Sequence, residues 1–205
     1  MNYIRKLSIV VFLSISTGFF PFVVVASSRE VEENRERLIR TNECLGCNLF
    51  YANLRGESLN SANLNGANLF NAILIGARLS NAKLTHTYMS NANLSKAILV
   101  NADLTYADLN GAHLIDANLK DAKLIHTNLS NSDLSGANLE NADLAYANLN
   151  GADMSGTVLE GVNLNNTQVK ETFFLGVVGL TDKQIDDLKS RGAIVETVDN
   201  NIGIF

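Results

Sequence analysis

The chain contains 205 residues, of which 16 are basic and 21 acidic, so its formal net charge is −5 at neutral pH. An acidic balance disfavours binding to nucleic acid or to an anionic membrane surface, because both attract basic proteins. The length accommodates one domain with extensions at its ends.

Residues 1–26 have the composition of an export signal. Arg5 and Lys6 precede a long apolar stretch, and Val24 and Ala26 are small enough for the positions that signal peptidase reads. We therefore expect cleavage after Ala26 or close to it, with an uncleaved membrane anchor as the alternative. Cleavage leaves 14 basic and 21 acidic residues, a net charge of −7, and predicts a mature protein that binds neither nucleic acid nor membrane.

Residues 27–43 are predicted to form an N-terminal helical cap. Within this segment, residues 28–41 have the pattern of a short helix, in which Glu33 and Arg37 form a favourable i,i+4 pair. We expect the helix to cover the first turn of the structure that follows. A helix that binds a partner is the alternative.

A five-residue repeat begins at Leu49. Every fifth residue from there to Leu164 is leucine, except Met89 and Met154, and the residue two places earlier is small, usually alanine. A period of five fits neither the 3.6-residue helix nor the two-residue strand. A solenoid turns all these side chains inward if each five-residue unit forms one side of a coil. The repeat therefore predicts an all-β solenoid over residues 44–175.

Units such as 67–69 (Ala-Asn-Leu) and 102–104 (Ala-Asp-Leu) resemble the A-(D/N)-L-x-x signature of the pentapeptide-repeat family, over about 130 residues. The resemblance implies a right-handed quadrilateral β-helix with about 20 residues per coil, and relatives in cyanobacteria that are exported to the periplasm or the thylakoid lumen. It departs at the ends, where Glu57 occupies a small-residue position and Val169 and Phe174 replace leucine.

Cys44 and Cys47 are the only cysteines and form a C-x-x-C motif. Counting back in fives from Leu49 places both at inward positions of the opening turn. A zinc site is disfavoured, because it needs about four ligands and the histidines lie far along the chain. In an exported protein, two neighbouring core cysteines favour a structural disulfide. Two buried free thiols and a redox-active pair are the alternatives.

Two outward columns recur at twenty-residue intervals and favour a four-sided coil over a three-sided one. The charge ladder comprises Lys83, Asp103, Lys123 and Asp143, and the aromatic ladder comprises His86, Tyr106, His126 and Tyr146. In such a coil the members of each ladder would stack at about the 4.8 Å strand spacing, where opposite charges attract. We interpret the charge ladder as a device that sets register, with an ion site as the alternative.

Aromatic side chains gather on one predicted outer side. We expect Phe50, Phe70 and Tyr88 to be exposed beside the aromatic ladder. Together with that ladder they form a candidate interaction strip, since contiguous exposed aromatic residues mark protein contact sites. The alternative is that stacked rings only stabilise neighbouring coils.

Residues 176–205 are predicted to form a second helical cap and a tail. Thr181 and Gln184 have the spacing of a capping box, which predicts a helix over about 182–190 that ends near Gly192. Residues 193–198 are strand-like and are expected to return along the stack.

No catalytic constellation occurs in the repeats, and their inward positions are almost wholly apolar or small. We therefore expect a non-enzymatic exported protein without metal or cofactor, a rigid rod whose outer faces contact a protein partner. The expected location is the periplasm or the thylakoid lumen, with secretion as the alternative. A homodimer through a cap or an open coil edge is a further partner arrangement.

Two other functions compete with this expectation. One is a thiol–disulfide redox protein that works through Cys44 and Cys47. The other is an acidic DNA mimic that inhibits a type II topoisomerase, a mode of action of some members of the family. DNA mimicry is disfavoured because residues 44–175 contain eleven acidic and seven basic residues, a net charge of only −4. The alternating charge ladder also interrupts any acidic stripe.

Overall fold

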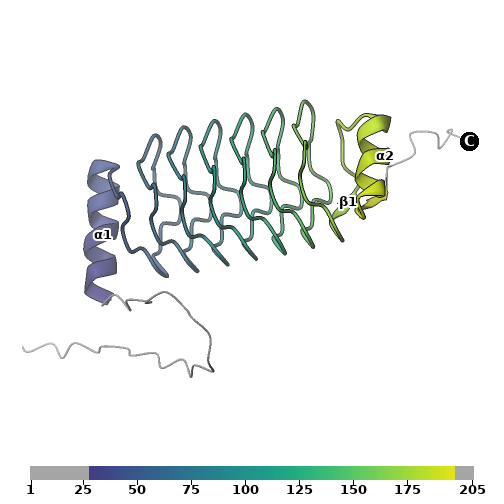
Figure 1. Cartoon of the computed structure of the whole chain (residues 1–205). Helices are drawn as coiled ribbons and strands as arrows, with labels where there is room; N and C mark the ends of the chain where they lie inside the picture. Colours follow the sequence, from purple (N-terminus) through teal and green to yellow (C-terminus); the bar gives the residue numbers. More distant parts are fainter. Residues whose placement is uncertain (1–27, 197–205) are drawn as a thin grey trace, which may run out of the picture.

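The computed structural model describes residues 28–196, which form a stack of coils with a helix at each end (Figure 1). The export signal predicted for residues 1–26 lies outside the described residues, as does the tail from 197 to 205. The helices and strands are α1 (Ser28–Thr41), β1 (Phe173–Leu175), α2 (Asp182–Ser190) and β2 (Ile194–Glu196). Across residues 28–196, neither helix combines the length and the apolar character needed to cross a bilayer.

Each coil of the stack contains twenty residues. Every isolated β-bridge joins two residues twenty positions apart in parallel, as Lys83 does with Asp103. Hydrogen bonds between coils have the same register: the Leu104 amide donates to the carbonyl of Lys123 at 2.8 Å. With a five-residue repeat, four sides therefore make up one coil, and a residue lies beside its equivalent in the next coil.

The leucines of the repeat line the interior of this stack. All of those from Leu49 to Leu159 are fully buried, as are Met89 and Met154. The alanines two places earlier fill the remaining space and are also buried. Where threonine replaces alanine its hydroxyl is paired, since Thr127 Oγ1 donates to the carbonyl of a leucine in the coil below at 2.8 Å. The apolar repeat thus forms one continuous core.

Each side of a coil ends in a turn whose third residue has a positive φ. At one such corner the Ala107 amide donates to the Leu104 carbonyl at 2.9 Å, and Tyr106 between them has a φ of +60°. Asparagine and glycine occupy most equivalent corners, because they adopt the left-handed region at low cost. These corners turn the chain so that every leucine points inward.

Helix α1 lies across the N-terminal end of the stack (Figure 1). Its Leu38 is fully buried. Its Arg35 donates to the carbonyl of Asn53 at 2.6 Å and pairs with the Glu57 carboxylate at 3.1 Å. These contacts explain why a glutamate occupies a small-residue position of the repeat: Glu57 belongs to the edge coil and faces the helix.

Helix α2 and strand β2 lie at the other end. β2 pairs in parallel with β1, and Leu188 of α2 is fully buried. The helix begins with the capping box between Thr181 and Gln184, in which each side chain bonds to the backbone amide of the other residue. At both ends of the stack the chain therefore leaves the five-residue repeat and forms a helix.

Candidate functional site

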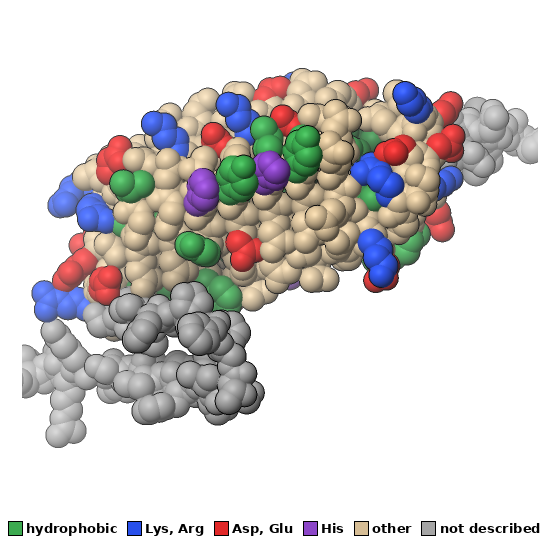
Figure 2. All heavy atoms as spheres, viewed as in Figure 1, with side chains coloured by type: hydrophobic (Ala, Val, Ile, Leu, Met, Phe, Trp, Pro, Cys, Tyr) green, Lys and Arg blue, Asp and Glu red, His purple; other side chains and the backbone are tan. Residues whose placement is uncertain are grey.

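One side of the stack carries both ladders, and we call it the ladder face. It comprises residues 62–66, 82–86, 102–106, 122–126, 142–146 and 162–166. In each coil, the central leucine and the small residue two places earlier point inward, and the other three positions form the outer side, where only Ala145 is buried. Figure 2 shows histidine and hydrophobic side chains alternating in a row on the outside of the molecule.

The aromatic ladder forms a continuous stack of four rings. The ring centroids of His86 and Tyr106 are 5.1 Å apart, those of Tyr106 and His126 are 4.8 Å apart, and those of His126 and Tyr146 are 4.9 Å apart. The planes are close to parallel, with only 3° between the middle two rings. The structure thus brings together the four residues that the sequence placed in one column.

All four ladder rings lie at corners with positive φ, between +56° and +61°. Bulky residues rarely adopt this conformation, and it has an energetic cost. Ring stacking offsets part of that cost. Tyr106 and Tyr146 are still about half exposed, at 52% and 53%. The faces of the inner rings, Tyr106 and His126, are occupied by their neighbours, so these two rings offer mainly their edges, with the N–H and O–H groups, for contact.

The charge ladder has the expected register, but the expected ion pairs do not form. Lys83, Asp103, Lys123 and Asp143 are bridged through their backbones in sequence, yet no salt bridge joins them among residues 28–196. The Asp103 carboxylate instead accepts the amide of Thr105 at 3.1 Å, in the same coil. The predicted ion pairs within the ladder are therefore absent from the described residues. Both acids accept the amide two residues further on, and Asp143 also accepts the side-chain amide of Asn163 in the next coil at 2.8 Å.

The Phe50–Phe70 part of the predicted interaction strip is also corrected. These two residues are half-buried and stack on each other with centroids 5.5 Å apart, rather than standing exposed. Tyr51, which the sequence analysis missed, packs edge-on against Phe50 and is 60% exposed. Tyr88 is exposed as expected. Within residues 28–196 no ring contact joins this group to the aromatic ladder, so the strip divides into two groups.

An ion pair between coils occurs on a different side, where sequence analysis did not place one. Lys120 Nζ lies 2.8 Å from a carboxylate oxygen of Glu140, twenty residues further on. The two side chains share one column, and the signal for the pair was this twenty-residue spacing. The hydrogen bond from Lys120 to Glu140 raises the pKa of the lysine above its ordinary value, because it favours the charged ammonium.

Replacing Glu140 by glutamine is expected to lower the pKa of Lys120 toward its ordinary value. The raised pKa means that the pair stabilises the fold at neutral pH, and that this contribution is lost as the pH rises through the pKa of Lys120. Titration of the Lys120 side chain by NMR measures the change. Glu160→Gln, in the same column but without an ion pair in the described structure, is the matched control and should leave the titration unchanged.

Cys44 and Cys47 lie beneath α1 and are joined by a disulfide. They are 1% and 5% exposed. The guanidinium of Arg37 from α1 donates to Cys47 Sγ. Both sulfurs are therefore enclosed between the helix and the first coil, at the inward positions that the repeat assigns to them.

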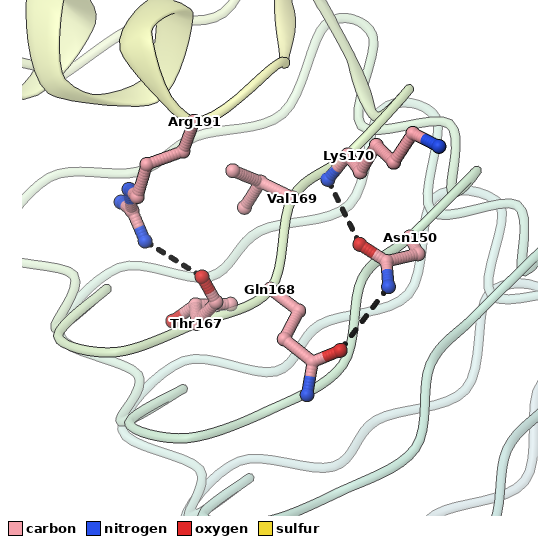
Figure 3. A pocket seen from close by; sticks show the side chains of 6 residues that line it. All are labelled: Asn150, Thr167, Gln168, Val169, Lys170 and Arg191. Carbon is pink, nitrogen blue, oxygen red and sulfur yellow. Dashed lines mark hydrogen bonds between the residues drawn. The ribbon is translucent and has the colours of Figure 1, made fainter.

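A shallow hollow near α2 is lined by polar side chains that bond mainly to one another and to the backbone (Figure 3), although the buried Nε of Arg191 has no hydrogen-bond partner among residues 28–196. Arg191 donates to the carbonyl of Thr167 at 2.6 Å. Asn150 donates to the side-chain oxygen of Gln168 at 3.2 Å and accepts the amide of Lys170 at 2.8 Å. In the part of the chain that the structure describes, no group of three or more histidine, cysteine or acidic side chains gathers that could hold a metal.

Parallel twenty-residue coils around an apolar lining define a β-solenoid. The family model of pentapeptide repeats, in eight copies, matches residues 47–85, 62–99, 97–136 and 137–174. These matches cover more than half of the chain, so it belongs to the pentapeptide-repeat family. Membership of this family implies a right-handed β-helix, and the parallel twenty-residue coils of this stack agree with that architecture.

Several solved structures are similar to this chain. HetL, a pentapeptide repeat protein involved in heterocyst differentiation regulation from Nostoc sp. strain PCC 7120, is 32% identical over 66% of this chain and 76% of its own, with a TM-score of 0.39. Rfr23 from Cyanothece 51142 is 32% identical over 69% of this chain and 92% of its own, with a TM-score of 0.44.

A pentapeptide repeat protein from the thylakoid lumen of Arabidopsis thaliana is 25% identical over 74% of this chain and 85% of its own, with a TM-score of 0.35. A search of the curated proteins finds no match.

Proposed function

We propose that this chain is a non-enzymatic exported interaction protein, a rigid β-helical rod whose outer faces contact another protein. The observation that carries the proposal is the aromatic ladder. Tyr106, Tyr146 and nearby Tyr88 are all more than half exposed on a scaffold whose interior is filled by leucine. Exposed aromatic side chains held on a rigid frame lose little conformational entropy on binding, which favours protein contact.

Affinity capture from the exported fraction of the native cell tests this proposal. The bait with Tyr88→Ser, Tyr106→Ser and Tyr146→Ser should recover at least about tenfold less partner than the unchanged protein, since aromatic anchors often contribute 2 kcal/mol or more to binding. Tyr51→Ser is the matched control, because Tyr51 is 60% exposed but lies outside the ladder. Equal recovery by the triple variant would contradict the proposal.

Export is part of the proposal and rests on residues 1–26. The proposed compartment is the periplasm or the thylakoid lumen, with secretion as the alternative. A chain that retains Arg5 and Lys6 after isolation from the cell would count against cleavage. Sequencing the N-terminus of the isolated protein decides the point, and a start at or close to Ser27 is the expected result.

The two helical segments are proposed to act as caps. An open coil edge presents unpaired backbone groups that invite further strands. The pairing of Arg35 with Glu57 and the burial of Leu38 support this role for α1, and the pairing of β2 with β1 supports it for the C-terminal segment. Covered edges leave the sides of the rod as its contact surface.

The burial of Cys44 and Cys47 favours a structural disulfide over a redox-active one. Reactive cysteines lie in partly exposed surroundings, whereas these two are almost fully covered by α1 and the first coil. A structural bridge should resist mild reductant and should not catalyse reduction of an insulin-type substrate. Measurable turnover of that substrate would favour the redox alternative.

DNA mimicry is the weaker alternative, because acidic and basic residues alternate along the ladder face. Supercoiling by gyrase is expected to continue unchanged in the presence of excess mature protein. Inhibition of supercoiling by the protein would favour DNA mimicry over the proposed function.

A further inference from the structure

The two ladders alternate over the same four coils. If either ladder is set against a second copy that runs in the opposite direction, unlike members face each other at every coil. Along the stack the charge ladder runs Lys83, Asp103, Lys123, Asp143, and the aromatic ladder runs His86, Tyr106, His126, Tyr146. Reversing the direction of either series exchanges basic with acidic and histidine with tyrosine at every coil. This complementarity suits contact with a second ladder face that runs in the opposite direction. Stacking of the coils within one chain does not need it.

A twofold axis that lies in the plane of the ladder face, across the stack, produces that arrangement. It reverses the order of the coils and sets each column opposite the same column of a second copy. Centred between the coils of Asp103 and Lys123, the axis places each of these two residues opposite the other in the second copy. It likewise places His86 opposite Tyr146 and Tyr106 opposite His126, so each aromatic contact offers one imidazole and one phenol for hydrogen bonding.

The flanking coils and the middle of the face are compatible with the same axis. Asn63 falls opposite Asn163, and Asn65 opposite Asn165, so amide meets amide at both ends. The central column contains Thr85, Thr105, Ile125 and Ala145, of which Ala145 is buried and the other three are half-buried. The two outer ladders contain the exposed members of the face, so they can meet those of the second copy.

The alternation also excludes every register that is shifted by an odd number of coils. A shift of two coils keeps Lys83 opposite Asp103 but sets Lys123 opposite Asn63, so the centred register has the most opposite-charge contacts. A shift of one coil in either direction would set Asp103 opposite itself in the second copy, or Lys123 opposite itself. The aromatic ladder would then meet histidine with histidine and tyrosine with tyrosine. Opposite charges across an interface fix register in this way, since like charges in contact are costly. Ligands that stack on ring faces fit this surface poorly, because the inner rings already cover each other.

We propose that the ladder faces of two copies of this chain pair about this twofold axis to form an antiparallel dimer. The inference rests on the proposed function, an interaction protein that uses this face, and names a second copy as the partner. The contact involves four to six coils, roughly 20–30 Å at the strand spacing. One side of a coil is five residues wide, roughly 15 Å, so the face covers roughly 300–450 Å² per partner. A standard interface buries about 800 Å² per partner, so the dimer is expected to be weak and to dissociate as salt is raised.

Two charge-reversal variants test the arrangement by sedimentation velocity on the protein as the cell produces it. In Lys123→Asp or Asp103→Lys alone, both central contacts of the dimer join like charges. Each single variant should therefore raise the dimer dissociation constant at least tenfold. In an equimolar mixture, a heterodimer of the two variants has opposite charges at both contacts, and its dissociation constant should return to within about threefold of that of the unchanged protein.

The mixture separates contact between chains from effects within one chain. Each variant places like charges next to one another along its own ladder, and mixing cannot relieve that. Circular dichroism and the melting temperature establish that both variants are folded before they are mixed. A mixture that associates no more tightly than the single variants, or an unchanged protein that stays monomeric at all concentrations, would overturn the inference. If the protein is monomeric while the tyrosine variants lose a different captured protein, the inference falls and the proposed function stands.

Discussion

Replacing Leu104 by alanine is expected to lower the free energy of unfolding by about 2–5 kcal/mol. Leu104 is fully buried at the middle of the stack. The adjoining coils cannot move together to fill the space that its side chain would leave. Hydrogen bonds fix the backbones on both sides of this coil: the Leu84 amide donates to the carbonyl of Asp103, and the Leu104 amide donates to the carbonyl of Lys123. Loss of three carbon atoms there removes apolar burial and leaves a cavity. Equilibrium unfolding in urea measures the change.

Leu45 provides the matched control. It is the same residue type but is 68% exposed on the first coil. Leu45→Ala should change the free energy of unfolding by no more than about 0.5 kcal/mol, as is usual for surface substitutions. A loss below about 1 kcal/mol for Leu104→Ala would contradict the burial of the leucine repeat.

Replacing Gly179 by alanine is expected to destabilise the C-terminal end by about 2 kcal/mol or more. Gly179 has a φ of +91°, and an added Cβ would clash with the amide nitrogen of Glu160 and lie 3.0 Å from the carbonyl carbon of Leu159. Both atoms are backbone, so neither can move aside as a flexible side chain would. The segment must lift from the last coils, which weakens the docking of α2. Hydrogen exchange of the α2 amides should therefore accelerate, and the melting temperature should fall.

Gly156→Ala separates the clash from the backbone conformation. Gly156 also has a positive φ, +68°, but the nearest atom to an added Cβ is 3.8 Å away. Its substitution should cost only the left-handed conformation, about 1–2 kcal/mol, and should leave hydrogen exchange in α2 unchanged. Equal exchange rates in the α2 amides of the two variants would contradict a backbone clash at Gly179.

The interior of the rod was predictable because one physical constraint acts at every coil. A five-residue period sends Leu104 and its equivalents to one side of the chain only if the chain turns a corner after each unit. The columns through Lys83 and through His86 then indicate the length of the coil, because their charged and aromatic members recur every twenty residues. The capping box at Thr181 is equally local, so the sequence alone indicated where α2 begins.

The contacts of the outer side chains were less predictable, because each exposed side chain has several partners within reach. Asp103 bonds the amide of Thr105 in its own turn, and this local bond competes with the lysine of the next coil. Lys120 reaches Glu140, although no alternation in their column drew attention to it. Phe50 and Phe70 turn toward each other and bury area that a count of outward positions assigns to solvent. Such choices depend on side-chain rotamers, which the repeat does not determine.

Trans-hydrogen-bond scalar couplings measured by NMR test the central claim most directly, because they identify which amide donates to which carbonyl. The twenty-residue coil predicts a coupling between the amide nitrogen of Leu104 and the carbonyl carbon of Lys123, and another between Leu84 and Asp103. Couplings to carbonyls about five residues nearer in sequence would indicate a three-sided coil. That result would contradict the ladder face and every inference drawn from it.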